Sequence, residues 1–447
     1  MRGRISSTIV LAFAAALATA ALATAAAPIA NLNVTAMPGN EAEDAIAVNP
    51  TNPSNVVAMS TLPDVVAGLA VGVSFNSGRT WSRSVIGATT SDPLGDICCD
   101  QQLAWDHFGN LWMTYLVNSS LDVFVAVSTD GGRSFRVAGD IPTNGDQPSI
   151  SAGANSVWVS WTRTPGNQIV ASGARVTGLG QYGSFSAPES VPSPGSNGDY
   201  GDTAVGPNGQ VMVTYQNSTN GQGGADIYTA VDPDGLGPAG FGHTTLVNHS
   251  HVGGFDYIAA KPNRSIDAEA NLAWDRTSGR VYLIWVDENP NESDNTDVMF
   301  QHSDDSGATW STAVKLNDDR TANSQYDPAI ALDQASGALA VSWYDTRNDL
   351  GTGGSGDIDG IRNDDFQIWA TDSTNHGASF ARNFQVSRGT SSAVAAGSFF
   401  DNGDYTHAAF VAGTFWPAWS DNSNSTGDNP NGTLHQFDLY TAKVSIP

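Results

Sequence analysis

The chain has 447 residues, including 47 glycines, and carries a formal net charge of -26. This acidic balance argues against binding to nucleic acids and anionic membranes, which both require a basic surface. It does not prevent a local arginine cluster from binding an anionic glycan. Short apolar runs of period two, separated by turns rich in Gly, Asn and Asp, predict an all-β protein.

The first 25 residues have the organisation of a secretory signal peptide. Arg2 and Arg4 precede an apolar run from Ile9 to Leu22, and small residues follow at positions 23–25. No later run is apolar enough to span a bilayer. We therefore expect a secreted protein, extracellular or periplasmic, in which residues 26–447 form one domain without membrane insertion.

One octamer recurs along the chain with the pattern Ser-x-Asp/Asn-x-Gly-x-Ser/Thr-aromatic. Asp or Asn two residues before Gly favours a tight turn, because its side chain caps the backbone and glycine accepts a positive φ. The final aromatic ring can then fold beneath the turn. Each octamer therefore predicts a β-hairpin. The four copies are Ser74–Trp81, Ser128–Phe135, Ser303–Trp310 and Ser373–Phe380.

The octamers resemble the Asp-box of sialidases and other Asp-box β-propellers. The resemblance implies four-stranded blades in which each box joins the third and fourth strands, on the face opposite the active site. Typical sialidases also carry an Arg-Ile-Pro motif before the first box, and this sequence lacks it. The resemblance therefore implies the fold and transfers no catalytic residue by position.

A second repeat consists of a polar residue, an apolar strand, a tight turn and a strand that ends in an aromatic residue. Seven copies predict seven blades, with six, as in typical sialidases, as the alternative. The segment Ile29–Met37 is strand-like, and we expect it to complete the last blade and close the ring, which removes exposed sheet edges. The copies begin at Glu43, Asp100, Gln147, Asp202, Glu269, Asp327 and Asp404.

These starting positions are predicted to form a first ring at the mouth of the central channel. Acids brought close together raise one another's pKa, which keeps a carboxyl protonated for acid catalysis. Asp100 is the catalytic candidate of this ring. Alternatively, each carboxylate caps the backbone where the chain enters a blade. The candidate ligands for a metal, with calcium favoured by the oxygen ligands, are Asp202, Glu269, Asp327 and Asp404; no organic cofactor is expected.

A second ring follows the second strand of each blade. Its members differ from blade to blade, which suits a ligand better than a folding rule. Asp345 and Arg347 form a carboxylate and a guanidinium fork two residues apart, and their alternative role is a simple ion pair. The candidate catalytic residues of this ring are Asp287, Asp345 and Arg347, and its candidate substrate-binding residues are Arg163, Tyr344 and Asp421.

Two long insertions project from the same face. The segment 241–265 contains His249, Tyr257 and Arg264, a set suited to proton abstraction and charge neutralisation at a uronate. The histidines of this segment could instead bind a metal or be solvated. The segment 349–365 is rich in Gly and Asp and is a candidate calcium loop, although it lacks the EF-hand pattern.

The chain has two cysteines, Cys98 and Cys99, directly before Asp100. In an oxidising compartment they have only each other or another chain to pair with. A vicinal disulfide would place a rigid apolar plate at the channel mouth, where it would contact substrate. The alternative is two buried thiols.

Three functions are consistent with the sequence. The first is a secreted enzyme that cleaves glycosidic bonds in an extracellular glycan, as a hydrolase or a lyase. The others are a non-catalytic glycan-binding or adhesion propeller and a calcium-bound structural surface module. The unequal second ring and the histidine segment favour an enzyme. Hydrolysis requires a carboxyl pair, whereas lyase chemistry favours the His–Tyr–Arg set. We expect a monomer.

Overall fold

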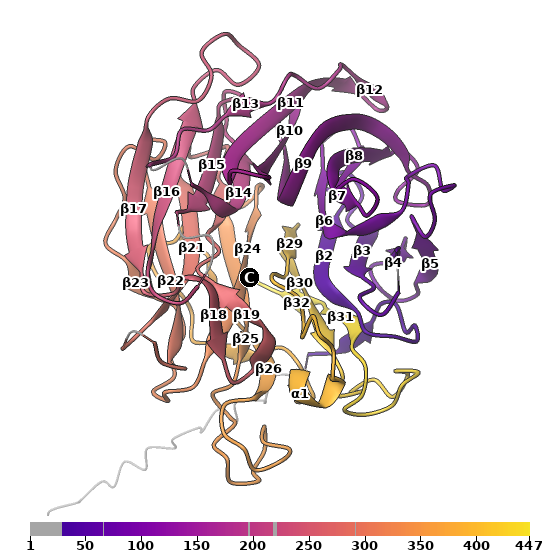
Figure 1. Cartoon of the computed structure of the whole chain (residues 1–447), viewed down its shortest axis with the longest axis vertical. Helices are drawn as coiled ribbons and strands as arrows, with labels where there is room; N and C mark the ends of the chain where they lie inside the picture. The colour runs from indigo at the N-terminus through magenta and orange to yellow at the C-terminus, as the bar shows by residue number, and fades with distance from the viewer. Residues whose placement is uncertain (1–28, 66, 195–196, 218–220, 291) are drawn as a thin grey trace, which may run out of the picture.

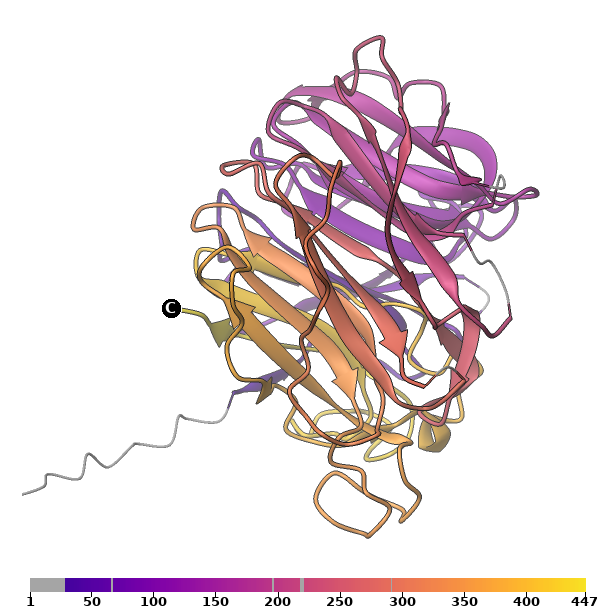
Figure 2. The ribbon, with the colours of Figure 1, turned by 90° about the vertical axis from the view of Figure 1, so that its left-hand side faces the viewer.

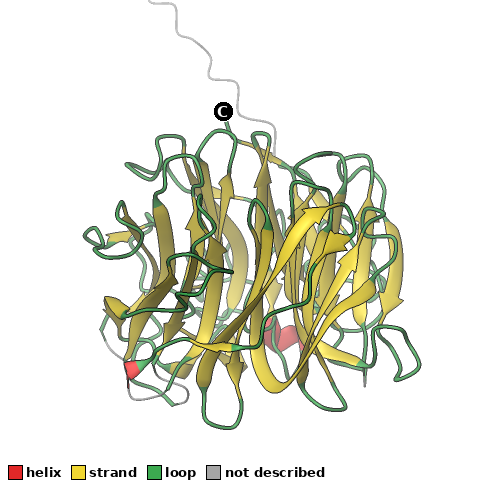
Figure 3. Cartoon of the chain, turned by 90° about the horizontal axis from the view of Figure 1, so that it is seen from above, coloured by secondary structure: helices red, strands yellow, loops and turns green. Residues whose placement is uncertain are grey.

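The structure is a computed structural model that describes residues 29–65, 67–194, 197–217, 221–290 and 292–447. The predicted signal peptide, residues 1–25, lies outside the described residues. Strands and loops make up almost all of the fold, and α1 spans only Ala393–Ala396 (Figure 3). Among the described residues, no helix is both long and apolar enough to cross a bilayer. The all-β prediction is confirmed.

The strands form antiparallel sheets in which strands consecutive in the chain are neighbours. The first sheet consists of β2 (Ala42–Val48), β3 (Val56–Thr61), β4 (Leu69–Ser74) and β5 (Ser82–Ile86). The next unit consists of β6 (Ile97–Trp105), β7 (Leu111–Val117), β8 (Asp122–Ser128) and the long β9 (Arg136–Ala152). Strand β9 continues into a further unit with β10 (Ser156–Arg163), β11 (Gln168–Gly178), β12 (Gln181–Tyr182) and β13 (Glu189–Ser190).

The second half of the chain continues this arrangement. One sheet consists of β14 (Asp199–Val205), β15 (Val211–Gln216), β16 (Ala225–Asp232) and β17 (Thr244–Ser250). A separate hairpin, β18 (Gly254–Ile258) and β19 (Lys261–Asp267), follows it. The next sheet consists of β20 (Asn271–Trp274), β21 (Val281–Glu288), β22 (Thr296–Ser303) and β23 (Val314–Lys315).

The last two sheets have five strands each. One consists of β24 (Gln325–Asp333), β25 (Ala338–Asp345), β26 (Asp365–Ser373), β27 (Phe384–Gln385) and β28 (Ser391–Ser392). The other consists of β29 (Ala408–Val411), β30 (Thr414–Asp421), β31 (Asp438–Ala442), β32 (Val444–Ser445) and β1 (Asn31–Asn33).

The first strand of each unit contacts the first strand of the next. These contacts run from β2 through β6, β9, β14, β20 and β24 to β29, and β29 contacts β2 again. In Figure 1 the first strands surround the centre of the view, whereas β5, β17 and β23 lie towards the rim. The units therefore stand around a common axis. Large buried side chains fill the space between them, among them Trp112, Trp158, Trp285 and Trp343.

The start of the described chain lies beside its end. Strand β1 pairs antiparallel with β31, with Asn31 opposite Ala442 and Asn33 opposite Tyr440. Figure 2 shows the indigo first residues next to the yellow C-terminal strands. The segment 29–37 therefore contributes a strand to the sheet formed by the C-terminal residues.

The octamers share one set of hydrogen bonds. In the second copy, Ser128 Oγ lies 2.8 Å from Asp130 Oδ1 and accepts the Gly132 N–H at 2.9 Å, while Asp130 Oδ1 accepts the Ser134 N–H at 3.0 Å. The same bonds recur in the other three copies. Gly132 has a φ of 90°, which a residue with a Cβ rarely adopts. The octamers are thus tight turns between the third and fourth strands.

In most units a residue with a positive φ lies on the first strand or just before it, usually beside a β-bulge. Register shifts accompany it in five units. Bulges change the direction of a side chain, and they are frequent beside functional sites. The residues are Glu43 (58°), Asp100 (58°), Gln147 (44°), Tyr200 (50°), Glu269 (23°) and Asp327 (43°). The placement of Asp202 in this ring is corrected: Tyr200 takes the position, because the sequence repeat begins at a polar residue and in this unit the polar Asp202 lies two residues after the positive φ.

Candidate active site at the channel mouth

A cluster of charged residues lies where the bulged first strands meet the β18–β19 hairpin. Arg264, on β19, binds Asp404 through both carboxylate oxygens, with Nε 2.5 Å from Oδ1. The ring of Phe400 lies 4.8 Å from the guanidinium carbon. Gln147 Nε2 also reaches Asp404 Oδ2, at 3.4 Å. The Arg264 side chain is 27% exposed, so it remains accessible from solvent.

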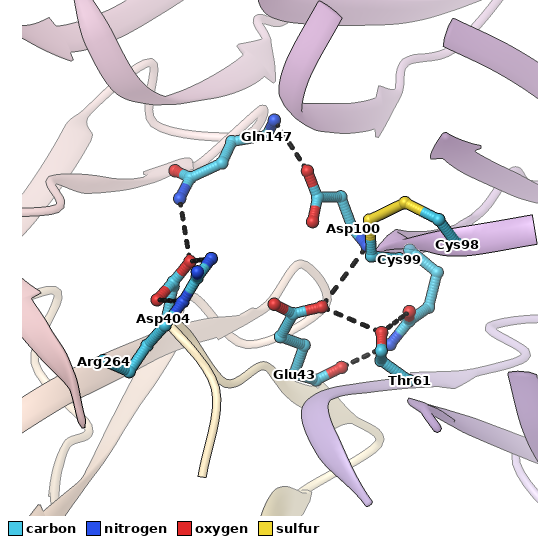
Figure 4. Close-up of a disulfide and its surroundings, with 9 residues drawn as sticks. Glu43, Thr61, Cys98, Cys99, Asp100, Gln147, Arg264 and Asp404 are labelled. Atoms are coloured by element: carbon cyan, nitrogen blue, oxygen red, sulfur yellow. Dashed lines mark hydrogen bonds and ion pairs between the residues drawn. A yellow bond between two sulfur atoms is a disulfide. The ribbon is translucent and has the colours of Figure 1, made fainter. Parts of the chain in front are cut away.

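Gln147 connects this ion pair to Asp100 and Glu43 (Figure 4). The Gln147 N–H donates to Asp100 Oδ2 at 2.9 Å, and the Asp100 N–H reaches Glu43 Oε2 at 3.4 Å. Glu43 also accepts the Thr61 hydroxyl at 2.8 Å, whereas its Oε1 is buried without a hydrogen-bond partner. The sequence reasoning named Glu43 as a ring member but did not include it among the candidate site residues.

The acids of this cluster favour the protonated form. Burial, together with the neighbouring Asp404, raises the pKa of Glu43 to about 7. Burial and the nearby Glu43 raise the pKa of Asp100 well above its usual range. Burial and the Asp267 carboxylate act in the same way on the pKa of Glu269. The cluster therefore holds carboxyl groups that can carry a proton near neutral pH.

Asp100 has a second carboxyl neighbour in Asp146, whose charge helps to raise the pKa of Asp100. Asp146 is exposed, whereas Asp100 is 5% exposed. Two carboxyls brought close together disfavour each other's charged form. The two carboxyls thus lie near each other, and the Asp146 side of the pair faces solvent.

A buried lysine holds the hairpin over part of the channel mouth. Lys261 is fully buried, and its Nζ lies 2.9 Å from Asp327 Oδ2 and 2.5 Å from the carbonyl oxygen of Gly403. Burial raises the pKa of Asp327 to about 7, although Lys261 opposes the shift. The hairpin is therefore fixed to β24 and to the segment before β29, and Asp327 has a lysine partner. Sequence reasoning did not single out Lys261, although it lies three residues before Arg264.

Aromatic side chains border the cluster. Phe255, on β18, packs edge-on against Tyr200 at 6.1 Å and is 38% exposed. Phe399 packs edge-on against Phe400 at 4.9 Å and is 70% exposed. Tyr257 of the same hairpin is 53% exposed. Exposed rings beside a polar cluster are suited to stacking on sugar rings.

Cys98 and Cys99 are joined by a disulfide directly before Asp100 (Figure 4). Both residues are half-buried, and both pack at the edge of an apolar cluster that contains Trp161 and Val123. No cysteine of the described residues is free. The disulfide lies on the bulged strand that carries Asp100.

Among the described residues, the side chains of the second ring do not contact this cluster and do not form one site with it. Asp345 is buried and accepts hydrogen bonds from Trp343 Nε1 at 2.6 Å and Arg347 Nε at 2.9 Å. The Arg347 guanidinium also bonds Asp318 at 3.0 Å and stacks on Trp369 at 4.1 Å. Asp345 and Arg347 therefore form the ion pair that was their alternative role. The contact of Arg347 with Asp318 connects two neighbouring sheets.

Further candidates of the second ring are likewise engaged in local contacts. The buried Tyr344 hydroxyl accepts the Ser420 N–H at 2.9 Å. Asp421 is buried and accepts Trp419 Nε1 at 2.9 Å and the Ser423 N–H at 2.8 Å. The guanidinium of Arg163 donates to Gln168.

The histidines form a separate exposed group above β16 and β21. His249 Nδ1 lies 2.9 Å from Asp226, and His251 Nδ1 lies 3.0 Å from Asp287. The two imidazole rings are 5.6 Å apart. Asp287 and His249 therefore belong to this group rather than to the contacts of Arg264.

The four candidate metal ligands do not share one centre. Asp202 accepts the Ser149 hydroxyl, at 2.5 Å, and the backbone N–H of Leu272 at 2.8 Å, so its carboxylate connects three neighbouring units. Asp327 pairs with Lys261, and Asp404 pairs with Arg264. Glu269 lies among the acids of the channel mouth.

No protein-family model matches the sequence, and no curated protein matches it. Among solved structures, the phage phi92 endosialidase matches with a TM-score of 0.50 and 10% identity, over 94% of this chain and 69% of that one. The polysaccharide lyase Uly1 matches with a TM-score of 0.49 and 10% identity, over 92% of this chain and 91% of that one. The α-L-arabinanase of Penicillium chrysogenum, complexed with arabinobiose, matches with a TM-score of 0.45 and 13% identity, over 71% of this chain and 93% of that one.

At these identities the likeness concerns the fold. The match to the endosialidase extends over nearly the whole chain, and the sheets stand around a common axis as a propeller requires. The chain therefore has a sialidase-like β-propeller fold. The fold predicted from the octamers is confirmed at this level.

Proposed function

We propose that the chain is a secreted, seven-bladed Asp-box propeller that hydrolyses glycosidic bonds of an extracellular glycan at the channel mouth. Seven successive first strands that contact one another in a ring support the blade count. The pairing of β1 with β31 supports closure by the N-terminal strand. The basic and apolar start of the sequence supports secretion.

The observation that carries the catalytic proposal is the solvent-accessible Arg264 beside carboxyl groups with raised pKa values. Asp100 is the proposed general acid, because its buried carboxyl retains a proton that the leaving oxygen requires. Asp146, a neighbouring carboxyl that is exposed, is the proposed partner that exchanges this proton with solvent. Arg264 and Gln147 are the proposed substrate-binding donors.

A structural role is the second candidate, and the buried Lys261 favours it. This lysine fixes a hairpin over part of the channel mouth, as expected of a propeller whose channel is filled by its own chain. The two functions differ in one respect that can be measured. A structural module leaves every glycan intact, whereas a hydrolase releases new reducing ends.

The test is a panel of neutral and anionic glycans with two readouts, new reducing ends and the ultraviolet absorbance of unsaturated uronates. Hydrolysis predicts reducing ends without absorbance. Asp100→Asn should abolish this release, and the surface variant Asp428→Asn should retain it. Absorbance together with reducing ends would instead indicate a lyase and would direct attention to His249 and Tyr257. Binding without cleavage of any glycan would overturn the enzymatic proposal.

A further inference from the structure

The loop between β25 and β26 gathers carboxylates away from the channel mouth. It is the orange loop beneath β26 in Figure 1, and it spans residues 346–364. Asp349, Asp364 and Asp365 each place a carboxylate oxygen within 4.8 Å of the others. Their exposed fractions are 0%, 4% and 1%. Residues 15 positions apart in the chain are thus brought together in a buried acidic group.

Backbone N–H groups donate hydrogen bonds to some of the carboxylate oxygens of this group. Asp349 Oδ2 accepts the N–H groups of Asp364 at 2.8 Å and Asp365 at 3.0 Å. Asp365 Oδ2 accepts the Ile358 N–H at 2.6 Å. These bonds hold the three carboxylates in fixed positions.

Two oxygens of the group have no partner. Asp364 Oδ1 and Asp365 Oδ1 are both buried and make no hydrogen bond. A buried carboxylate oxygen without a donor is costly, and native proteins almost always satisfy such atoms or coordinate a metal with them. These oxygens therefore point to a ligand that supplies positive charge.

The basic residues of the surrounding segment are engaged elsewhere. Arg347 is paired with Asp345 and Asp318. Arg362 Nε donates to Asn323 at 2.9 Å. In the described part of the chain, no ion pair reaches Asp349, Asp364 or Asp365, so no basic side chain neutralises their charge.

We propose that Asp349, Asp364 and Asp365 bind one calcium ion that joins the two ends of the β25–β26 loop. Calcium takes six to eight oxygen ligands, so carbonyl oxygens or water would complete its coordination. The group offers neither the nitrogen nor the sulfur ligands that zinc prefers. Magnesium requires a near-ideal octahedron and retains several waters, which suits three buried carboxylates less well.

A second acidic group extends the site. Asp357, Asp359 and Asp365 also bring carboxylate oxygens within 4.8 Å, so Asp365 belongs to both groups. The Asp357 carboxylate orders the loop around it by accepting the N–H groups of Gly353 at 2.7 Å and Gly360 at 2.8 Å. The ion would thus lie at the base of a loop that is already ordered by hydrogen bonds between its own backbone and Asp357. The inference does not depend on glycan cleavage.

Calorimetric titration of the chelator-treated full chain with calcium chloride tests this site. The expected result is about one calcium per chain, with a higher Tm in calcium and no comparable effect of magnesium. Asp364→Asn should weaken calcium binding at least about tenfold, because it removes a charged ligand. Asp372→Asn, the same substitution eight positions further along the chain, on β26, should bind as the wild type does.

The wild-type titration decides the question even if Asp364→Asn fails to fold. No calcium binding at millimolar concentration would overturn the proposal. Wild-type affinity in a folded Asp364→Asn chain would also overturn it, because the ion would then bind elsewhere. Equal binding of magnesium and calcium would contradict the identity of the ion.

Discussion

Arg264 and Asp404 lie 140 positions apart in the chain, yet the guanidinium Nε lies 2.5 Å from Asp404 Oδ1. The hairpin between two sheets supplies the arginine, and the segment just before β29 supplies the carboxylate. Each residue therefore depends on the packing of the whole ring to reach the other. This pair stands among buried acids, and the proposed chemistry of the channel mouth depends on it.

The octamer turns should contribute to stability and not to activity. Ser128 is buried, and its hydroxyl bonds both Asp130 and the Gly132 N–H. Ser128→Ala leaves that N–H without a partner and should lower the free energy of unfolding by about 1–3 kcal/mol. Ser134→Ala, at an exposed position of the same turn, should cost less. Denaturant unfolding and kcat/KM measure both effects, and a large loss of kcat/KM at unchanged stability would contradict a structural role.

The exposed ring of Phe399 should contribute to glycan binding. Phe399→Ala should raise KM up to about tenfold, the order expected for the loss of one stacking contact, and leave kcat nearly unchanged. Stability should change by less than about 0.5 kcal/mol, because the side chain is 70% exposed. The control is Leu179→Ala, at a residue 54% exposed in the β11–β12 connection. An unchanged KM for Phe399→Ala would remove this ring from the substrate path.

The acid cluster should make the protein less stable as the pH rises. The pKa of Glu43 is raised to about 7 by burial and Asp404, and that of Asp327 to about 7 by burial. Between about pH 4.5 and pH 7 the native state keeps protons that the unfolded chain has released. The free energy of unfolding should therefore fall across this window, by about 1.4 kcal/mol per pH unit for each such proton.

Urea unfolding at several pH values measures this slope. Glu43→Gln should flatten it by about one proton, because glutamine does not titrate. Asp428→Asn, which removes an exposed carboxylate, serves as the control. A slope that is the same in Glu43→Gln and in the wild type would show that this carboxyl does not titrate in the window.

The fold could be predicted because its signal is local and repeated. Each octamer carries its own turn chemistry, in which Ser128 and Asp130 satisfy the backbone within a few residues. Four such turns and seven strand repeats specify the arrangement of the sheets without any long-range information. The position of Tyr200 could not be predicted, because the sequence repeat begins at a polar residue, whereas in this unit an aromatic residue has the positive φ.

The candidate site was only partly predictable. Asp100, Arg264 and Asp404 were named from their positions in repeats and insertions, and the structure brings Arg264 and Asp404 into contact. Asp345 and Arg347 stood at equally suggestive positions, but their side chains turn into the contact between two sheets. Side-chain direction at the end of a strand depends on neighbouring sheets, and the sequence of one repeat does not contain that information.

The most direct test of the central claim compares Arg264→Gln with Arg280→Gln on a glycan that the wild type cleaves. Arg280 pairs with Asp304 at the surface of an octamer turn, so its loss should change kcat/KM little. Arg264→Gln should lower kcat/KM at least about a hundredfold, because it removes a bidentate charged donor from the site. Circular dichroism should show that both variants are folded. A folded Arg264→Gln chain with wild-type kcat/KM would contradict an active site at the channel mouth.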